Sequence, residues 1–183
     1  MKLTVSHCSR NSKRDIKLMK LDGLIPAVIY RRGKDSNKVH ILKKEFETHL
    51  RTIEKGHLAT TVFTMSFEGK EEKVVVKGIE YAKTTYDIMH IDLQPLHEGT
   101  VKVRVPIVLD GVKDCEAVKA GFGLKLVKRY VRVESSVKAI PQEFRIDVRK
   151  LQPREKIRVS DLGIGGDVRI LADENELVVT ASK

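Results

Sequence analysis

The chain has 183 residues, of which 41% are hydrophobic and 33% charged, and its 35 Lys and Arg against 25 Asp and Glu give a net charge of +10. This length suits one large domain or two small ones, and the basic balance indicates an anionic partner, either a nucleic acid or a membrane surface. Cys8 and Cys115 form neither a disulfide framework nor a zinc pattern, and no apolar run reaches the length of a membrane span, so a cytoplasmic protein without membrane contact is expected.

The N-terminal segment combines a strand with a strongly basic stretch. Alternation predicts a strand over residues 2–8, and the second part of the polar stretch 9–20 is expected to be helical. Three- and four-residue spacing would then place four cations along one side, away from Leu18 and Leu21: Arg10, Lys13, Lys17 and Lys20. Residues 1–34 carry nine Lys and Arg and two acids, or +7, which indicates an anion-binding surface or, alternatively, a solubilising face.

More strands and one more helix are expected up to residue 93. Residues 24–30 (LIPAVIY) predict a buried strand that begins at an edge or bulge, because Pro26 lacks a ladder donor. A helix is expected over 43–55, and strands over 38–42, 58–67, 72–81 and 86–93. Alternation in the last strand puts Asp87, Met89, Ile91 and Leu93 on one face, and Tyr86, Ile88, His90 and Asp92 on the other.

The segment 94–100 (QPLHEGT) marks a domain boundary. We expect a first domain over residues 1–94 and a second over 95–183. Short alternating runs over 101–109, 124–134, 144–148 and 176–181 predict that the second domain is all-β. Its cations Lys125, Lys128, Arg129 and Arg132 are a candidate weaker RNA patch.

Catalytic and metal sites are not indicated. The six histidines have no metal-ligand spacing, and no Ser/His/Asp or Cys/His arrangement can be assigned. The glycines at 121–123 and 163–166 match no nucleotide-binding pattern and read as turn residues. We therefore expect no enzymatic activity, no metal, no cofactor and no small-molecule substrate.

His90 and Asp92 are the second candidate site beside the lysines. Lysines along one side of a helix can follow a phosphate backbone, whereas an Asp in a basic RNA site must accept hydrogen bonds from base donors. The alternative is that His90 is an ordinary barrel-surface residue and that Asp92 caps the following turn.

Two motifs resemble a known family. Residues 24–30 after Asp22-Gly23, and the closing His90-Ile91-Asp92-Leu93, are similar to motifs of the bacterial large-subunit ribosomal protein that binds 5S rRNA. The tail resembles the second domain of the long form, the general stress protein Ctc type, and five motifs fall in the expected order: Val105-Pro106-Ile107, Cys115, Val118-Lys119, Ile140-Pro141 and Ser160-Asp161-Leu162.

The resemblance implies a mainly β fold: a six-stranded N-terminal β-barrel with short helices, followed by a second β domain. It also implies a structural role in the cytoplasmic ribosome, beside other large-subunit proteins, with the barrel bound to the loop E region of 5S rRNA. Lys13, Lys17, Lys20, Tyr30, His90 and Asp92 match the RNA-contacting positions of the family.

Some positions depart from the family pattern. Lys17 and Lys20 stand where the family has arginines, Leu18 replaces a further basic residue, and Glu80 replaces a glutamine. These departures leave open a stress-related adaptor whose RNA site has decayed. A third reading is a tRNA-binding domain, because the barrel resembles the anticodon-binding domain of glutaminyl-tRNA synthetase, although no catalytic nucleotide-binding motif accompanies it.

Overall fold

The computed structural model describes residues 1–8, 12–31, 36–67, 69–96, 99–137, 139–163, 165 and 168–183. The chain divides into two compact units, Met1–His97 and Glu98–Lys183, and each is described by itself. The boundary expected after residue 94 lies just before this division. Among the described residues, no helix has the length and apolar character needed to cross a membrane.

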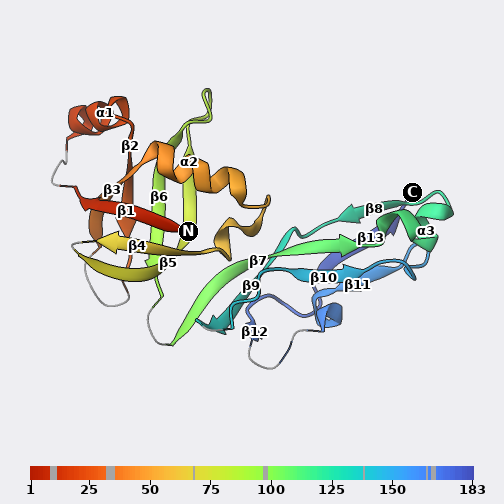
Figure 1. The fold of residues 1–183 in the computed structure, drawn as a ribbon. Helices are drawn as coiled ribbons and strands as arrows, with labels where there is room; N and C mark the ends of the chain where they lie inside the picture. The colour runs from red at the N-terminus through yellow and green to blue at the C-terminus, as the bar shows by residue number, and fades with distance from the viewer. Residues whose placement is uncertain are drawn as a thin grey trace. The chain divides into compact units, whose positions relative to one another are not determined.

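Six strands close a barrel in the first unit (Figure 1). In pairing order they are β1 (Lys2–His7), β3 (Asn37–Leu42), β2 (Leu24–Ile29), β6 (Ile88–Pro95), β5 (Lys70–Tyr81) and β4 (Val62–Phe67). β4 pairs in parallel with β1, and β6 with β2, while the other neighbours are antiparallel. The helices α1 (Lys13–Leu21) and α2 (Lys43–Thr52) and the turn η1 (His57–Ala59) complete the unit. The predicted six-stranded barrel with short helices is confirmed.

Apolar side chains fill the barrel because alternate residues of each strand point inward. Fully buried members come from all six strands: Leu3, Ile25, Ile41, Phe63, Met65, Val74, Ile91 and Leu93. α2 contributes Phe46, whose ring centroid lies 6.3 Å from that of Phe63. Leu50 and Ile53 pack against this cluster.

The boundaries of α2 and β4 differ from the sequence prediction. α2 ends at Thr52 rather than at residue 55, because the backbone of Ile53 is already extended, with ψ 132°. The strand expected from residue 58 begins at Val62, because Gly56, with φ 94°, starts the turn η1 instead.

Pro26 lies in a closed barrel, not at the edge of an open sheet. The N–H of Tyr30 donates to the carbonyl of Leu93, so the nitrogen of Pro26, an even number of residues earlier, also faces β6. Pairing of β2 with β6 begins only at Ala27. The missing donor is tolerated because Pro26 precedes the ladder that would have needed it.

A β-bulge changes the predicted faces at the start of β6. Glu80 lies opposite His90 and Tyr81 opposite Ile88, so Met89 is an extra residue in β6. The predicted faces of Ile88 and Met89 are therefore wrong, because Ile88 is 7% exposed and Met89 is 38% exposed. From His90 onward the predicted alternation holds, with Ile91 and Leu93 buried and His90 and Asp92 partly exposed.

The second unit contains two sheets. One has the order β10 (Phe144–Asp147), β7 (Thr100–Asp110), β9 (Tyr130–Ser136), β12 (Val168–Ile170), and the other β11 (Lys156–Arg158), β13 (Leu177–Ser182), β8 (Gly123–Leu126). Short helical turns accompany them: η2 (Val112–Asp114), α3 (Glu116–Lys119) and η3 (Val159–Leu162). The second β domain is confirmed, but the single strand expected over 124–134 is two strands in different sheets. The break follows Val127, whose N–H still donates to Val178 of β13.

Substitutions at Phe63 and at its neighbour Val62 distinguish the contribution of core packing to stability from that of strand propensity. Phe63 is fully buried, whereas Val62 lies on the exposed face of β4. We expect Phe63→Ala to lower the free energy of unfolding by about 3–5 kcal/mol, because it removes a ring and leaves a cavity. Val62→Ala should change it by about 0.5 kcal/mol or less. Denaturant unfolding of both variants measures the difference, and equal losses would contradict the described core.

Candidate nucleic-acid interface

α1 carries the basic side chains near the N-terminus. It begins at Lys13 because the hydroxyl of Ser12 accepts a hydrogen bond from the N–H of Asp15 at 3.1 Å, an N-cap interaction. It ends at Leu21, with Asp22 as its C-cap, before Gly23, whose φ of 72° suits glycine. Arg10 and the side chain of Lys13 lie outside the described part of the chain. Lys17 and Lys20 are the candidate lysines whose side chains the structure describes.

Met19 packs α1 against the barrel of the first unit. Its side chain is buried, and its Sδ lies 3.6 Å from the Sγ of Cys8, just after β1. Arg14 and Lys17 are exposed on the opposite side of the helix, together with Leu18 and Leu21. Because Lys17 and Leu21 are four residues apart, they are neighbours on this surface. The prediction that Leu21 lies away from the cations is wrong, since the exposed surface of α1 is both basic and apolar.

A contact between Lys20 and Met89 brings α1 next to the closing strand. The ammonium group of Lys20 donates to the Sδ of Met89 at 3.1 Å. Met89 is available because the bulge in β6 turns it outward, next to His90. The two candidate groups, the lysines of α1 and the residues of β6, are therefore adjacent in space.

His90 and Asp92 form a pair on the outer face of β6. The Nδ1 of His90 lies 3.3 Å from the Oδ1 of Asp92, and their side chains are 26% and 33% exposed. Asp92 does not end its strand, because β6 continues to Pro95. The alternative that Asp92 caps the following turn is therefore wrong.

Gly78 on β5 leaves room for the carboxylate of Asp92. A second irregularity between Val76 and Gly78 places Gly78 directly opposite Asp92. A Cβ at Gly78 would lie 3.4 Å from the Oδ2 of Asp92, at the limit of ordinary contact. A larger side chain would push the carboxylate aside. Gly78 was missed in the sequence prediction, although a glycine inside a strand is a known signal of a bulge or a close approach.

Tyr30 extends the outer face on the β2 side. In the parallel pairing of β2 with β6, Val28 lies opposite Asp92 and Ile29 opposite Leu93. Ala27 and Ile29 are buried, so the alternation turns Tyr30 outward with Val28, and its ring is 50% exposed. Tyr30, His90 and Asp92 thus lie on one side of neighbouring strands.

Two acidic residues of β5, Glu72 and Glu80, lie beside Arg31 and His90. Arg31 is engaged by Glu72, with its Nη2 2.9 Å from Oε2, and both side chains are largely buried. Glu80 lies opposite His90 and is exposed. Sequence spacing could not identify the Arg31–Glu72 pair, because Arg31 follows β2 while Glu72 lies on β5, and the two meet only in the folded barrel.

An ion pair holds the turn that leads into β6. The ammonium group of Lys43, at the start of α2, lies 2.7 Å from the Oδ1 of Asp87. The hydrogen bond from Lys43, assisted by Thr85, keeps the pKa of Asp87 below its ordinary value of 3.8. The same hydrogen bond raises the pKa of Lys43.

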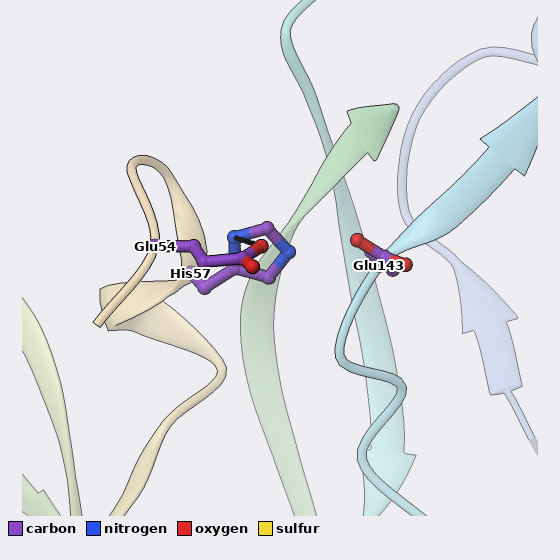
Figure 2. A group of neighbouring side chains, drawn as sticks. All are labelled: Glu54, His57 and Glu143. Carbon is purple, nitrogen blue, oxygen red and sulfur yellow. Dashed lines mark ion pairs between the residues drawn. The ribbon is translucent and has the colours of Figure 1, made fainter. Parts of the chain in front are cut away.

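Figure 2 shows the side chains of Glu54, His57 and Glu143. Within the first unit, the Nδ1 of His57 lies 3.9 Å from the Oε2 of Glu54. Glu143 belongs to the second unit, so the first unit contributes only the pair of Glu54 and His57. Two protein ligands are fewer than the three or four of zinc sites, and the pair supports no metal centre.

Comparison with known proteins gives matches over both units. Residues 5–93 match the model of the ribosomal L25p family, and residues 100–183 match that of the C-terminal domain of ribosomal protein TL5. Large ribosomal subunit protein bL25 of Chlamydia muridarum (strain MoPn / Nigg) is 38% identical over 184 residues, covering 100% of both chains. The proteins of the same description from Chlamydia trachomatis serovar L2 and Chlamydia pneumoniae are 37% and 34% identical, also over 100% of both chains.

The Lys43–Asp87 pair predicts a pH effect of known sign. Because the folded-state pKa of Asp87 is lowered, the pair stabilises the fold above about pH 3.8, and this contribution is lost as the pH falls through the folded-state pKa. We expect Lys43→Ala to return the pKa of Asp87 toward 3.8, as measured by NMR titration of its carboxyl group. Lys44→Ala removes the next, exposed lysine and should leave Asp87 unchanged. An equal shift in both variants would rule out the specific pair.

Proposed function

Because the chain belongs to the bacterial bL25 family of large ribosomal subunit proteins, we propose that it binds 5S rRNA, at the loop E region, through α1 and the outer face of β2 and β6. Family membership makes the chain a ribosomal structural protein of the bacterial cytoplasm, not an enzyme, as predicted. It also removes the reading as a tRNA-binding domain. The proposal concerns the RNA that the barrel recognises and the residues that contact it.

The Lys20–Met89 contact is the observation that supports this proposal most. It holds a basic helix beside a strand face that carries a carboxylate, an imidazole and, on the neighbouring strand, an exposed tyrosine ring. Base edges in an RNA minor groove lie between two phosphate backbones, and this groove is wide and shallow enough for side chains to enter. A surface that reads it needs cations at the side and acceptors in the middle.

The lysines of α1 supply the cations. Lys17 is exposed and Lys20 is half-buried against Met89. A lysine ammonium acts on phosphate as a point charge without the paired geometry of a guanidinium. We therefore assign Lys17 and Lys20, together with Lys13 and Arg10, to phosphate contacts that position the RNA without selecting its sequence.

Asp92 supplies the acceptor. In a minor groove, the exocyclic amino group of guanine is the donor that base edges present, and a carboxylate can accept its hydrogen bond. His90 holds one oxygen of Asp92 through the 3.3 Å contact, while the other lies over Gly78, which has no side chain to cover it. We assign base recognition to Asp92, positioning of its carboxylate to His90, and stacking on an RNA surface to Tyr30.

Leu18 and Glu80 are the observations that favour the second candidate, an adaptor with a decayed RNA site. Leu18 is exposed on α1 where the resemblance to the family implies a basic residue, and Glu80 adds a negative charge opposite His90. Binding of the full chain to a 5S rRNA fragment that contains loop E, compared with a generic RNA duplex of equal length, decides between the two. Equal affinity for both RNAs would contradict the proposal and favour the adaptor.

Lys17→Ala tests the positioning role. Loss of one phosphate contact should weaken binding to the 5S fragment and the generic duplex alike, and should lower the salt slope by about 0.9. Lys44→Ala, which removes an exposed lysine of α2, is the matched control and should alter neither quantity. The measurement is fluorescence anisotropy over a salt series. A change in sequence preference at constant salt slope would contradict this role.

Asp92→Asn tests base recognition with little change in shape. We expect a cost of roughly 1–3 kcal/mol on the 5S fragment, because an amide replaces a charged acceptor, and a much smaller cost on the generic duplex. Asp87→Asn is the control, since Asp87 is bound to Lys43 instead. Thermal unfolding of both variants verifies that they fold. Equal losses on both RNAs would remove the base-reading role.

A further inference from the structure

The pair of strands β7 and β9 in the second unit presents a basic outer face that the proposed 5S contact does not use. Five valines alternate along these strands and are buried: Val101, Val103, Val105, Val131 and Val133. The residues between them are therefore turned outward and exposed: Lys102, Arg104, Tyr130 and Arg132. Glu134 is the acidic residue of the face, opposite Lys102, and it accepts a hydrogen bond from Thr100 at 3.0 Å.

Arg104 and Arg132 lie directly opposite each other across the two strands. Like charges at directly opposed positions destabilise a sheet. Among the described residues, neither guanidinium forms an ion pair with a carboxylate that would offset this repulsion. An arrangement that costs stability and concentrates positive charge indicates a surface that an anion occupies.

Tyr130 adds an aromatic surface to the two arginines. The guanidinium carbon of Arg104 lies 5.3 Å from the centroid of the Tyr130 ring, and the tyrosine is 47% exposed. This stacking holds Arg104 beside the ring. Unstacked RNA bases stack on aromatic rings and on guanidinium planes, and the guanidinium charge also attracts their phosphates.

A hollow of about 560 Å³ adjoins Tyr130 and Arg132. Its walls also include Lys128, Arg129, Leu171 and Glu176. Lys128 is paired with Glu176, so Arg129 and Arg132 supply its remaining cations. Its volume falls in the range of small-ligand sites and suits one nucleotide. The patch suggested by the sequence is thus revised, because Lys125 lies on β8 in the other sheet and Arg104 joins Arg132 instead.

We propose that this face binds a single-stranded or bulged RNA segment, with Arg104, Arg132 and Arg129 on its phosphates and a base against Tyr130 or in the hollow. An acidic protein segment would satisfy the charges, but the exposed ring beside the hollow fits a nucleobase better. The site lies in the second unit and does not depend on the proposed 5S contact.

The test measures binding of the full chain to a fluorescent single-stranded RNA of 12 nucleotides at several salt concentrations. We expect the double variant Arg104→Ala/Arg132→Ala to bind about tenfold more weakly, with a salt slope lower by about 1.4, the value for two phosphates of a single strand. Lys113→Ala/Lys119→Ala removes two exposed lysines of η2 and α3 and should change affinity less than threefold. Tyr130→Ala should weaken binding about fivefold or more, and Tyr130→Phe should not.

The same double substitution in a Lys17→Ala/Lys20→Ala background separates this site from the barrel. We expect the same fold-loss there, whether or not the barrel variant loses 5S rRNA. Arg132→Ala alone should leave the melting temperature unchanged or raise it, because it removes the repulsion. Unchanged RNA affinity in the Arg104/Arg132 variant would overturn the proposal; unchanged affinity with lost co-sedimentation on large subunits would assign the face to a protein partner instead.

Discussion

The pairing of β6 with β2 on one side and β5 on the other is the constraint on which the first unit depends. These two ladders close the barrel and force Ile91 and Leu93 into its core. Because neighbouring residues of a strand point to opposite faces, the burial of these two side chains alone places His90 and Asp92 outside. The candidate site is therefore a direct consequence of core packing, and a one-residue shift of register would bury it.

Two irregularities in the β5–β6 ladder refine this arrangement. The bulge at Met89 turns a thioether outward, where it meets Lys20, and so joins α1 to the strand face. The irregularity at Lys77 brings Gly78 opposite Asp92 and leaves space for its carboxylate. Bulges often occur beside functional sites because they redirect a side chain without ending the strand. Here they bracket the segment that we propose reads bases.

The two units present cations in different ways. In the first, lysines on a helix lie beside a carboxylate. The lysines are suited to positioning the RNA backbone, and the carboxylate to selecting a base in the groove. In the second, opposed arginines and a tyrosine lie on a sheet, a combination suited to unstacked nucleotides. The difference is consistent with two separate RNA contacts for a protein of the large ribosomal subunit.

Local patterns in the sequence were sufficient for most strands of the first unit and for its two helices, whereas net charge left open a nucleic acid or a membrane surface as the partner. Alternation identified β1 and most of β6, and an apolar run identified β2, because these patterns reflect backbone geometry that neighbouring residues decide among themselves. The outward direction of His90 and Asp92 followed from the same alternation. Tertiary structure alone decided the faces of Ile88 and Met89, the place of Gly78, the Arg31–Glu72 pair and the meeting of Arg104 with Arg132. Each of these depends on register between strands that are distant in the chain, and register is set by the packing of the whole sheet, which no local pattern records.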